Sequence, residues 1–405
     1  MGVLGTRRGM AFAEAAAQVP GARVVAFCGR DPRRLELVGE RYPEAQLLTS
    51  YDELVALPEV DAVIVANYAD EHAPAACRAL GAGKHVLSEV PAFNTIAEGV
   101  ELVRTVEATG RRYMLAENFC YLPWVQEMRR LYEAGDLGEI RYAEGEYVHF
   151  TRDVLHQLID LDLPHHWRLW IPPTFYITHS LGPILRISGL RPAAVQAATG
   201  LLQTRNGGPP LPSPALETVR LENGALVKSL HGGPYPREPW QPWTLLGGTN
   251  GCIENDRWLD PHQLTRYLDG QGVRRYRAPL AEYAARAQHW GADYFVLERF
   301  VASVRGEAAP DFDVYMAADV TLCGHMAWRS VLSGGGWVEV PDFRDEAVRR
   351  AWADDRASCR PDAPAGDRLP NHQLAGATVL PPEEVLARIR ARQAQEPYYA
   401  AWYRD

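Results

Sequence analysis

DAVIVANYADEHAPAACRALGAGKHVLSE, residues 61–89, predicts a strand, a helix and a second strand in direct succession. The apolar runs at 61–66 and 84–89 have the length and composition of buried strands. Between them, the alanine-rich segment 73–81 has the composition of a helix. Strands that are joined through a helix lie parallel in one sheet, so this stretch predicts a parallel sheet.

The same alternation continues on both sides of this unit. Further strands are expected at 1–4, 23–28 and 112–116, and further helices at 10–18, 32–42 and 97–109. Apolar strands that alternate with helices are typical of α/β proteins, in which helices cover both faces of the sheet. The first third of the chain therefore predicts a doubly wound domain.

The turn between the first strand and the first helix carries GTRRG, residues 5–9. In doubly wound folds this turn binds the pyrophosphate of a dinucleotide on the helix N-terminus. The pattern G-x-G-x-x-G, counted from Gly5, is incomplete, because its second position is Arg7 and its third is Met10. The strand before the turn is also shorter than about five residues, which indicates a misassigned start or a trimmed end. We expect cofactor contacts from Gly5, Thr6, Arg7 and Arg8.

The end of the second predicted strand reads Cys28-Gly29-Arg30-Asp31. An acidic residue usually ends this strand and binds the ribose hydroxyls of NAD, whereas an arginine suits the 2′-phosphate of NADP. Arg30 is therefore a candidate cofactor residue, and both NAD and NADP stay open. The alternative is that the arginines here are solvated charges at a helix start.

Composition sets limits on the function. The chain has 405 residues, enough for two domains, with 47% hydrophobic and 23% charged residues. A net charge of −9 gives no electrostatic support to nucleic-acid binding. Six dispersed cysteines without a C-x-x-C pair indicate reduced thiols rather than disulfides or a zinc site. No membrane-spanning run and no signal peptide are evident, so we expect a cytoplasmic enzyme.

A second stretch, PPTFYITHSLGP at 172–183, carries the candidate chemistry. Tyr176 and His179 are three residues apart, so both side chains lie on one face of a helix. A phenol and an imidazole side by side can transfer protons, and these two residues are our catalytic candidates. The alternative is an ordinary buried pair that is satisfied by hydrogen bonds.

The remainder of the chain predicts an α+β domain. Strands are expected at 140–150, 191–200, 217–222, 225–232 and 243–247. Asn223-Gly224 is a strong hairpin signal, and hairpin-linked strands form an open, mainly antiparallel sheet. We expect domains at 1–120 and 121–345, and a C-terminal extension at 346–405 with one helix, 381–395, and an aromatic tail.

The segment 151–172 is rich in charged and aromatic side chains. His165 and His166, with Asp160 and Asp162 nearby, could suggest a metal, but adjacent histidines point in different directions and a third ligand is not evident. We therefore expect no metal and favour sugar binding, with a loop of purely structural role as the alternative. The candidate substrate residues are Tyr121, His166, Trp167 and Arg168.

Several segments, in this order, resemble those of the glucose–fructose oxidoreductase/inositol dehydrogenase (Gfo/Idh/MocA) superfamily. They are ANYADEHAP (66–74), GKHVLSEVP (83–91), NFCYLP (118–123), QHWGADY (288–294) and DVY (313–315). The resemblance covers about residues 1–345. It implies an α/β protein with an N-terminal Rossmann domain, a nicotinamide cofactor and a homodimer or homotetramer. It also implies cofactor contacts from Asn67, His72, Glu89 and Asn118.

Two departures point to one branch of that superfamily. Val90 stands where the family has a catalytic lysine, and Phe175 stands where it has an aspartate four residues before the histidine. The segments EVPA (89–92) and YITHSLGP (176–183) resemble those of NAD-dependent glycosidases of the α-N-acetylgalactosaminidase type. That resemblance implies transient oxidation at C3 of a sugar, loss of the C2 proton, elimination of the aglycone, addition of water and return of the hydride. The alternatives are a net sugar or cyclitol dehydrogenase and a non-catalytic protein that binds sugar or cofactor.

Overall fold

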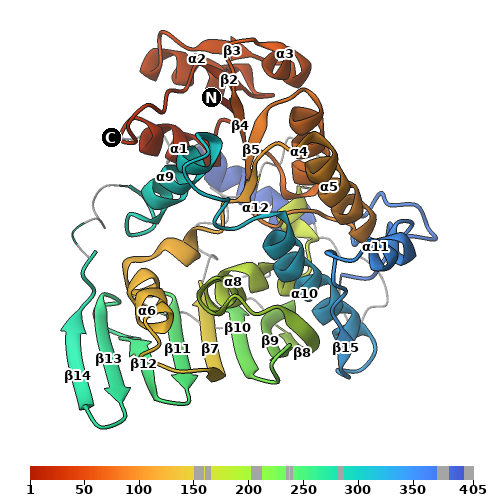
Figure 1. Cartoon of the computed structure of the whole chain (residues 1–405). Helices are drawn as coiled ribbons and strands as arrows, with labels where there is room; N and C mark the ends of the chain where they lie inside the picture. The colour runs from red at the N-terminus through yellow and green to blue at the C-terminus, as the bar shows by residue number, and fades with distance from the viewer. Residues whose placement is uncertain are drawn as a thin grey trace.

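The computed structural model describes residues 1–149, 159, 166–201, 212–233, 237, 240–280, 282, 287–371 and 383–395. Figure 1 shows two sheets, one above the other, with helices between them and around the upper sheet. The upper sheet belongs to the first third of the chain and the lower sheet to the rest. The predicted fold class, α/β with a second α+β region, is confirmed. The domain boundaries near 120 and 345 stay a prediction.

The upper sheet has six strands, all parallel, in the order β3-β2-β1-β4-β5-β6. They are β1 Gly2–Leu4, β2 Ala26–Cys28, β3 Gln46–Leu48, β4 Ala62–Val65, β5 His85–Ser88 and β6 Tyr113–Leu115. The four residues of β4 are fully buried, as expected for an apolar run that is covered on both faces. The chain reverses its direction of travel across the sheet between β1 and β4, which is where such sheets bind ligands.

The helices of this half begin at recognisable caps. They are α1 Arg8–Ala16, α2 Pro32–Arg41, α3 Tyr51–Ala56, the 3₁₀ helix η1 Ala69–Glu71, α4 His72–Gly81 and α5 Ile96–Thr109. The Thr95 hydroxyl accepts a hydrogen bond from the backbone N–H of Glu98, and the Glu98 carboxylate accepts one from the backbone N–H of Thr95. This capping box fixes the start of α5, and Gly110 in the left-handed region ends it.

The lower sheet has nine strands in the order β14-β13-β12-β11-β7-β10-β9-β8-β15. Only β7 and β10 pair in parallel among the described residues, so the sheet is mainly antiparallel, as predicted. Its strands are β7 Ile140–Val148, β8 Pro192–Leu201, β9 Pro212–Leu221, β10 Leu226–Gly232, β11 Trp243–Gly248, β12 Gly251–Asn255, β13 Gln263–Leu268, β14 Gly272–Arg277 and β15 Val338–Glu339.

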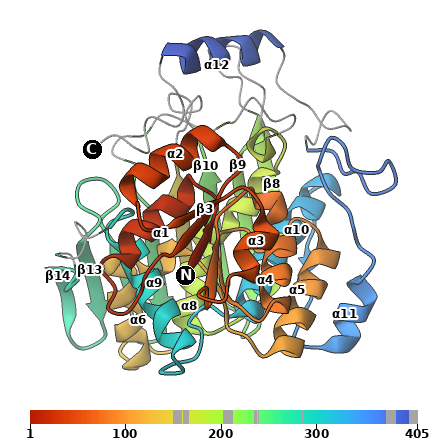
Figure 2. The ribbon, with the colours of Figure 1, turned by 90° about the horizontal axis from the view of Figure 1, so that it is seen from above.

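One face of this sheet is covered by helices. The helical elements of this half are η2 Asn118–Tyr121, α6 Pro123–Glu133, η4 Trp167–Leu169, η5 Pro173–Tyr176, α8 Ile177–Ser188, α9 Ala292–Val304, α10 Val314–Leu332, α11 Glu346–Trp352 and α12 Glu383–Gln395. Helix α8 packs on β7 and β10, and α10 packs on β8. Figure 2 shows α12 at one edge of the molecule, where Gln393 donates a hydrogen bond to the backbone of Ile159.

Length and hydropathy argue against a bilayer-spanning helix: none in the described part of the chain is both long and apolar enough. Helix α10 is the longest of these helices, with 19 residues, and its buried side includes polar residues such as Asp319 and Thr321. It packs against α5, α8 and β6, so its apolar surface contacts other parts of the fold.

Candidate active site

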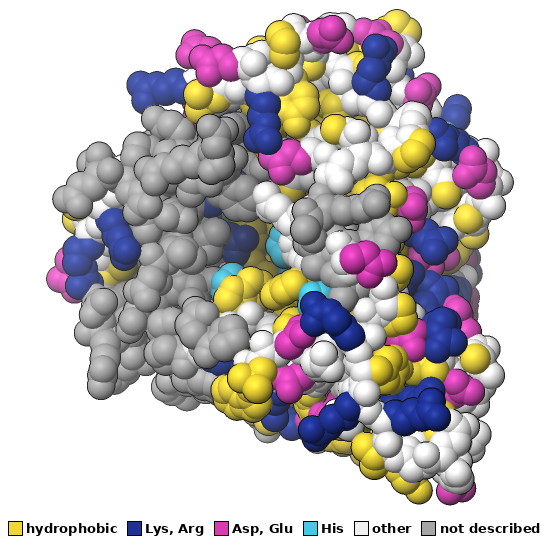
Figure 3. All heavy atoms as spheres, turned by 90° about the vertical axis from the view of Figure 1, so that its left-hand side faces the viewer, with side chains coloured by type: hydrophobic (Ala, Val, Ile, Leu, Met, Phe, Trp, Pro, Cys, Tyr) yellow, Lys and Arg dark blue, Asp and Glu magenta, His cyan; other side chains and the backbone are white. Residues whose placement is uncertain are grey.

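The candidate site lies where the carboxyl ends of the parallel strands face the lower sheet. Asn67, Glu89 and Asn118 each follow one of the strands β4, β5 and β6 within three residues. Parallel strands place the residues after their carboxyl ends along one edge, which is where open α/β sheets bind ligands. Figure 3 shows a hollow on one face of the molecule, with histidine and hydrophobic side chains on its walls.

Tyr176 and His179 lie together in this region. Pro173 starts the 3₁₀ helix η5, Tyr176 ends it, and His179 stands in the first turn of α8. Their ring centroids are 5.8 Å apart. The sequence prediction that the two rings are neighbours is thus met, although the first residue belongs to a 3₁₀ turn rather than to the same α-helix.

A buried carboxylate holds the His179 ring. Nδ1 of His179 lies 2.8 Å from Oε1 of Glu117, which is fully buried. The Phe119 ring stacks on the imidazole at a centroid distance of 4.6 Å, and Tyr147 meets it edge-on at 4.7 Å. Because a carboxylate accepts hydrogen bonds, Nδ1 carries the proton, and the lone pair of Nε2 stays available to a ligand.

A cation holds the Tyr176 hydroxyl. Arg168 donates a hydrogen bond to the phenol oxygen, and its guanidinium lies 4.3 Å above the centroid of the Trp167 ring. Burial raises the pKa of Tyr176, and the charge of Arg168 opposes that rise only in part. The group is therefore a phenol at neutral pH. Since Arg168 occupies a lone pair of the oxygen, the O–H proton can be donated to another acceptor.

Aromatic side chains that the sequence analysis did not select form one wall of the site. The Tyr147 hydroxyl lies 3.0 Å from Nδ1 of His149, which stacks on Trp240 at a centroid distance of 4.1 Å. Trp240 in turn contacts the ring of Trp290 at 5.4 Å. Burial, followed by the charges of Arg168 and the nearby histidines, lowers the pKa of His149 to about 4. The alternation of strand β7 was the available signal, because it places Tyr147 on the helix-covered face with Ala143 and Gly145.

The predicted substrate residues separate into two groups. His166, Trp167 and Arg168 are neighbours, with centroids of the first two rings 5.8 Å apart. Burial, aided by Arg168 and other arginines, lowers the pKa of His166 to about 2, so it is neutral. Tyr121 is different: its ring is fully buried in the core, and the Arg186 guanidinium covers it at 4.3 Å. The expectation of a substrate contact from Tyr121 is corrected, because a ligand cannot reach this ring without displacing packed side chains.

Arg8 has another role than the expected phosphate contact. It donates to Glu89 at 2.6 Å and to both carboxylate oxygens of Asp293 at 2.7 and 2.8 Å. Asp293 also accepts from Asn118 at 3.3 Å and lies 3.0 Å from Nδ1 of His289. Burial alone would raise the pKa of Asp293, but Arg8 and His289 hold it well below its usual range. We call Arg8, Glu89, Asn118, His289 and Asp293 the Asp293 cluster.

The glycine turn has the geometry of a dinucleotide site. Gly5 has φ +103°, and a Cβ there would lie 2.2 Å from the carbonyl oxygen of Ala66, so only glycine fits. A Cβ at Gly9 would lie 2.5 Å from Cγ1 of Val3. Gly9 therefore allows the close packing of helix on strand that the third glycine of the G-x-G-x-x-G pattern provides. Counted from Gly5, that third position falls on Met10, so the glycine stands one residue earlier than the pattern predicts. Thr6 is buried beside Gly29, and no side chain caps the N-terminus of α1.

The loop after β4 supplies further polar groups. Nδ2 of Asn67 donates to Glu71 at 3.0 Å, while its buried Oδ1 has no hydrogen-bond partner among the described residues. Arg30 bonds the other oxygen of Glu71 and lies 5.7 Å from the centroid of the Tyr68 ring. His72 is buried with Nδ1 2.9 Å from the carbonyl of Pro91. An unpaired amide oxygen beside a tight glycine turn and an uncapped helix fits a bound nucleotide.

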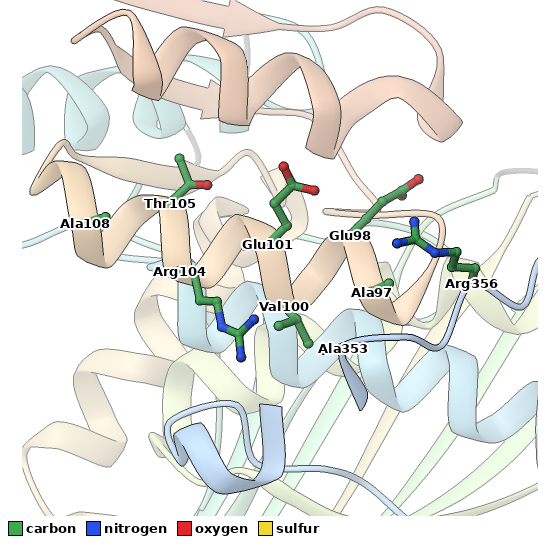
Figure 4. Close-up of a pocket in the computed structure, with 9 residues that line it drawn as sticks. All are labelled: Ala97, Glu98, Val100, Glu101, Arg104, Thr105, Ala108, Ala353 and Arg356. Carbon is green, nitrogen blue, oxygen red and sulfur yellow. The ribbon is translucent and has the colours of Figure 1, made fainter. Parts of the chain in front are cut away.

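Among the described residues, neither a metal site nor the groove along α5 offers comparable chemistry. In the described ranges, no group of three or more His, Cys, Asp and Glu residues has the arrangement of a metal site. His165, Asp160 and Asp162 lie outside those ranges. Figure 4 shows a groove along α5, bounded by Ala353 and Arg356. Its Arg104 is paired with Glu346, so it is a surface groove with structural ion pairs.

Comparisons with known proteins agree with this geometry. Residues 1–117 match the model of the Gfo/Idh/MocA oxidoreductase family, described by its NAD-binding Rossmann fold. Residues 246–351 match the C-terminal domain of glycosyl hydrolase family 109. The chain thus combines a region similar to the Gfo/Idh/MocA family with a region similar to the C-terminal domain of glycosyl hydrolase family 109.

Several curated proteins are similar to this chain over most of its length. A glycosyl hydrolase family 109 protein of Streptomyces niveus is 29% identical over 412 residues, covering 90% of this chain and 80% of the relative. Another, from Stenotrophomonas maltophilia strain K279a, is 25% identical over 409 residues, covering 85% of this chain and 88% of the relative.

Solved structures share the fold. Levoglucosan dehydrogenase in complex with NADH and L-sorbose has a TM-score of 0.73 at 19% identity, covering 84% of this chain and 98% of that one. An oxidoreductase of Agrobacterium radiobacter in complex with NAD⁺, L-tartaric acid and magnesium has a TM-score of 0.72 at 19% identity, covering 84% and 97%. At this identity, the likeness supports the architecture of both sheets and no particular substrate.

Proposed function

We propose that this Gfo/Idh/MocA protein is a nicotinamide-dependent enzyme that cleaves glycosides without net oxidation. The sugar is oxidised at C3, the aglycone leaves by elimination across C1 and C2, water adds, and C3 is reduced again. The net reaction is hydrolysis: glycoside and water give free sugar and an alcohol. When bound, the nicotinamide supplies the hydride acceptor and returns the hydride at the end. The relatives in glycosyl hydrolase family 109 support this proposal.

The observation that carries the proposal is the pairing of Tyr176 with His179. Nε2 of His179 accepts the C2 proton, because Nδ1–H is engaged with Glu117. The Tyr176 hydroxyl donates a proton to the departing glycosidic oxygen, which suits a phenol whose pKa burial has raised. Val90 cannot transfer a proton, so the usual lysine is not part of this chemistry.

We place the sugar between two aromatic walls. Stacked His149 and Trp240 offer one apolar surface to a ring face, and Trp167 with the Arg168 guanidinium offers another. The neutral, buried ring of His166 stacks on the Trp167 ring. This arrangement supports a pyranoside as the substrate class.

The nucleotide is placed along the carboxyl ends of the parallel strands. We assign it the turn residues Gly5, Thr6 and Arg7 and, from the following loops, Asn67, His72 and Asn118. Arg30, the residue considered for a 2′-phosphate, is already paired with Glu71, which favours NAD over NADP. Calorimetry with the two nucleotides tests this: tighter binding of NADP would contradict it.

The test of the function is an electron balance. We would incubate the purified protein with p-nitrophenyl glycosides and an amount of NAD far below that of substrate. The proposal predicts many moles of nitrophenol per mole of NAD and no accumulation of NADH. Accumulation of NADH in step with product would instead identify a net sugar or cyclitol dehydrogenase. Absence of nucleotide binding would identify a non-catalytic binding protein.

We also propose that the chain forms a homo-oligomer in the cytoplasm. The sheet face opposite α8 exposes large apolar side chains, including Tyr142, Leu216 and Leu226. An exposed apolar face of this kind is typical of an interface between subunits. Six free cysteines agree with a reducing compartment. Analytical ultracentrifugation tests the first statement, and a monomer at micromolar concentration would contradict it.

A further inference from the structure

Glu117 is a buried acid beside the candidate site. It directly precedes η2, and its side chain is fully buried. Oε1 accepts bonds from the His179 ring and from the backbone N–H of Phe119 at 3.3 Å, while Oε2 has no partner among the described residues. Burying a carboxylate costs several kcal/mol unless it is paired, so the fold alone gives no reason for an acid here.

The facing helix makes room for this carboxylate. A Cβ at Gly182 of α8 would lie 2.9 Å from Cγ of Glu117. Since Gly182 lies three residues after His179, one helix face provides both the imidazole and the space beside it. The carboxylate and the ring are therefore held together by packing as well as by their hydrogen bond.

Glu117 is also the acid that contacts this imidazole. The rings against His179 are those of Phe119, Tyr147 and Tyr176. The charged or titratable groups beyond them include Arg168, His149, His289 and Glu89. Glu89 is the acid among these, and it is bonded to Arg8 rather than to the imidazole. In the described structure, the negative charge in contact with the ring therefore comes from Glu117.

We propose that Glu117 is the positioning residue that fixes the tautomer of His179 and balances its charge. This inference rests on the proposed function, because it takes His179 as a base. Nδ1–H stays bonded to Glu117 while Nε2 takes one proton from substrate, so the ring becomes an imidazolium beside a carboxylate. No proton moves to Glu117. The carboxylate that Phe175 cannot supply thus comes from another element, 62 residues earlier in the chain.

The direct test substitutes Glu117→Gln. An amide can donate its N–H to Nδ1, which moves the ring proton to Nε2 and removes the base. We expect kcat for nitrophenyl glycosides to fall by about 10²–10⁴-fold with KM and NAD affinity little changed. Glu117→Asp, which keeps the carboxylate, should retain more activity than the glutamine variant.

The chain offers a matched control. Glu217 is also fully buried, and its Oε1 lies 2.8 Å from Nε2 of the equally buried His231. Glu217→Gln alters a buried carboxylate–histidine pair with the same 2.8 Å separation, made through Nε2 instead of Nδ1, outside the contacts of His179. We expect kcat for this variant within a few-fold of the unmodified protein. If Glu117→Gln loses no more activity than Glu217→Gln, the proposal is overturned.

A spectroscopic measurement separates this proposal from the proposed function. Nitrogen-15 spectra of the histidine-labelled protein report the tautomer of each ring, and a His179→Gln sample assigns the signal. We expect Nδ1–H in the unmodified protein and Nε2–H in Glu117→Gln. Finding Nε2–H in the unmodified protein would overturn the tautomer assignment even if the glutamine variant fails to fold. Finding Nδ1–H without any glycosidase activity would refute the proposed function and leave the tautomer assignment standing.

Discussion

At the scale of single residues, hydrogen-bond partners give the neighbouring rings of Tyr176 and His179 opposite roles in proton transfer. A carboxylate beside His179 and a guanidinium beside Tyr176 make one ring a proton acceptor and keep the other protonated. The sequence spacing predicts that the two rings meet. The spacing does not predict which ring accepts a proton and which donates one, because Glu117 and Arg168 reach the two rings from other elements.

Tyr176→Phe tests the phenol directly. The substitution removes one oxygen from a packed ring, so we expect the fold to persist and kcat to fall by about 10²–10⁴-fold, the usual contribution of a positioned acid. The matched control is Tyr142→Phe on the outer sheet face, where the hydroxyl binds Glu144. Steady-state kinetics on nitrophenyl glycosides compares them, and unchanged turnover in Tyr176→Phe would remove this residue from the chemistry.

His149 predicts a pH dependence of stability. Its pKa falls from 6.5 to about 4 on folding, so the unfolded chain binds a proton in a range where the folded chain does not. The free energy of unfolding therefore decreases as the pH drops through that range, by at most about 2.5 kcal/mol between pH 7 and 4.5.

Urea unfolding of His149→Gln at the two pH values measures this contribution. Glutamine does not titrate, so the variant should lose about 2 kcal/mol less than the unmodified protein over the same pH interval. Equal losses in both proteins would show that folding does not change the pKa of His149.

At the scale of elements, the Asp293 cluster connects helices α1 and α9 and the loop after β5 beside the site. Arg8 at the start of α1 binds Asp293 of α9 and Glu89 after β5. Three successive residues before α9 have left-handed backbones: His289 at φ 53°, Trp290 at 54° and Gly291 at 84°. For the two residues with side chains this conformation costs of order 1 kcal/mol each, and the His289–Asp293 bond helps to retain it.

Arg8→Ala tests the cluster. The change leaves Asp293 buried without its main counter-charge, so we expect the free energy of unfolding to fall by about 3–5 kcal/mol. Arg104→Ala is the control, because its ion pair with Glu346 is exposed and should contribute less than about 1 kcal/mol. Urea unfolding compares the two variants. Similar losses would show that the buried pair adds no more stability than the exposed one.

At the scale of the whole molecule, periodicity predicts the first domain well and long-range contacts poorly. The apolar runs of β4 and β5 predict buried strands because both faces are covered by helices. Strand β14, Gly272–Arg277, escapes prediction because it is an exposed, arginine-rich edge. Tyr121 was misplaced for the opposite reason: its local motif suggested a site contact, but tertiary packing put it in the core.

The roles of single residues, too, can be predicted where the residues are close in the sequence and not where they meet through long-range contacts. Tyr176 and His179 are close in sequence, so spacing is enough to associate them. Glu117 and Tyr147 reach the His179 ring from other elements, and Trp240 packs on Tyr147. Sequence spacing does not predict these contacts, although the alternation of β7 places Tyr147 on the helix-covered face. The resemblance to the Gfo/Idh/MocA superfamily supplied the cofactor region, whereas the structure assigned Arg8 and Glu89 to the Asp293 cluster.

The central claim is that hydrolysis proceeds through removal and return of the C2 proton. Cleavage of a nitrophenyl glycoside in D₂O with catalytic NAD, followed by proton NMR of the sugar, tests it most directly. We expect a product sugar with deuterium at C2, because the proton that His179 removes exchanges with solvent before another is added. A product that keeps its original hydrogen at C2 throughout complete hydrolysis would show that C2 is not deprotonated.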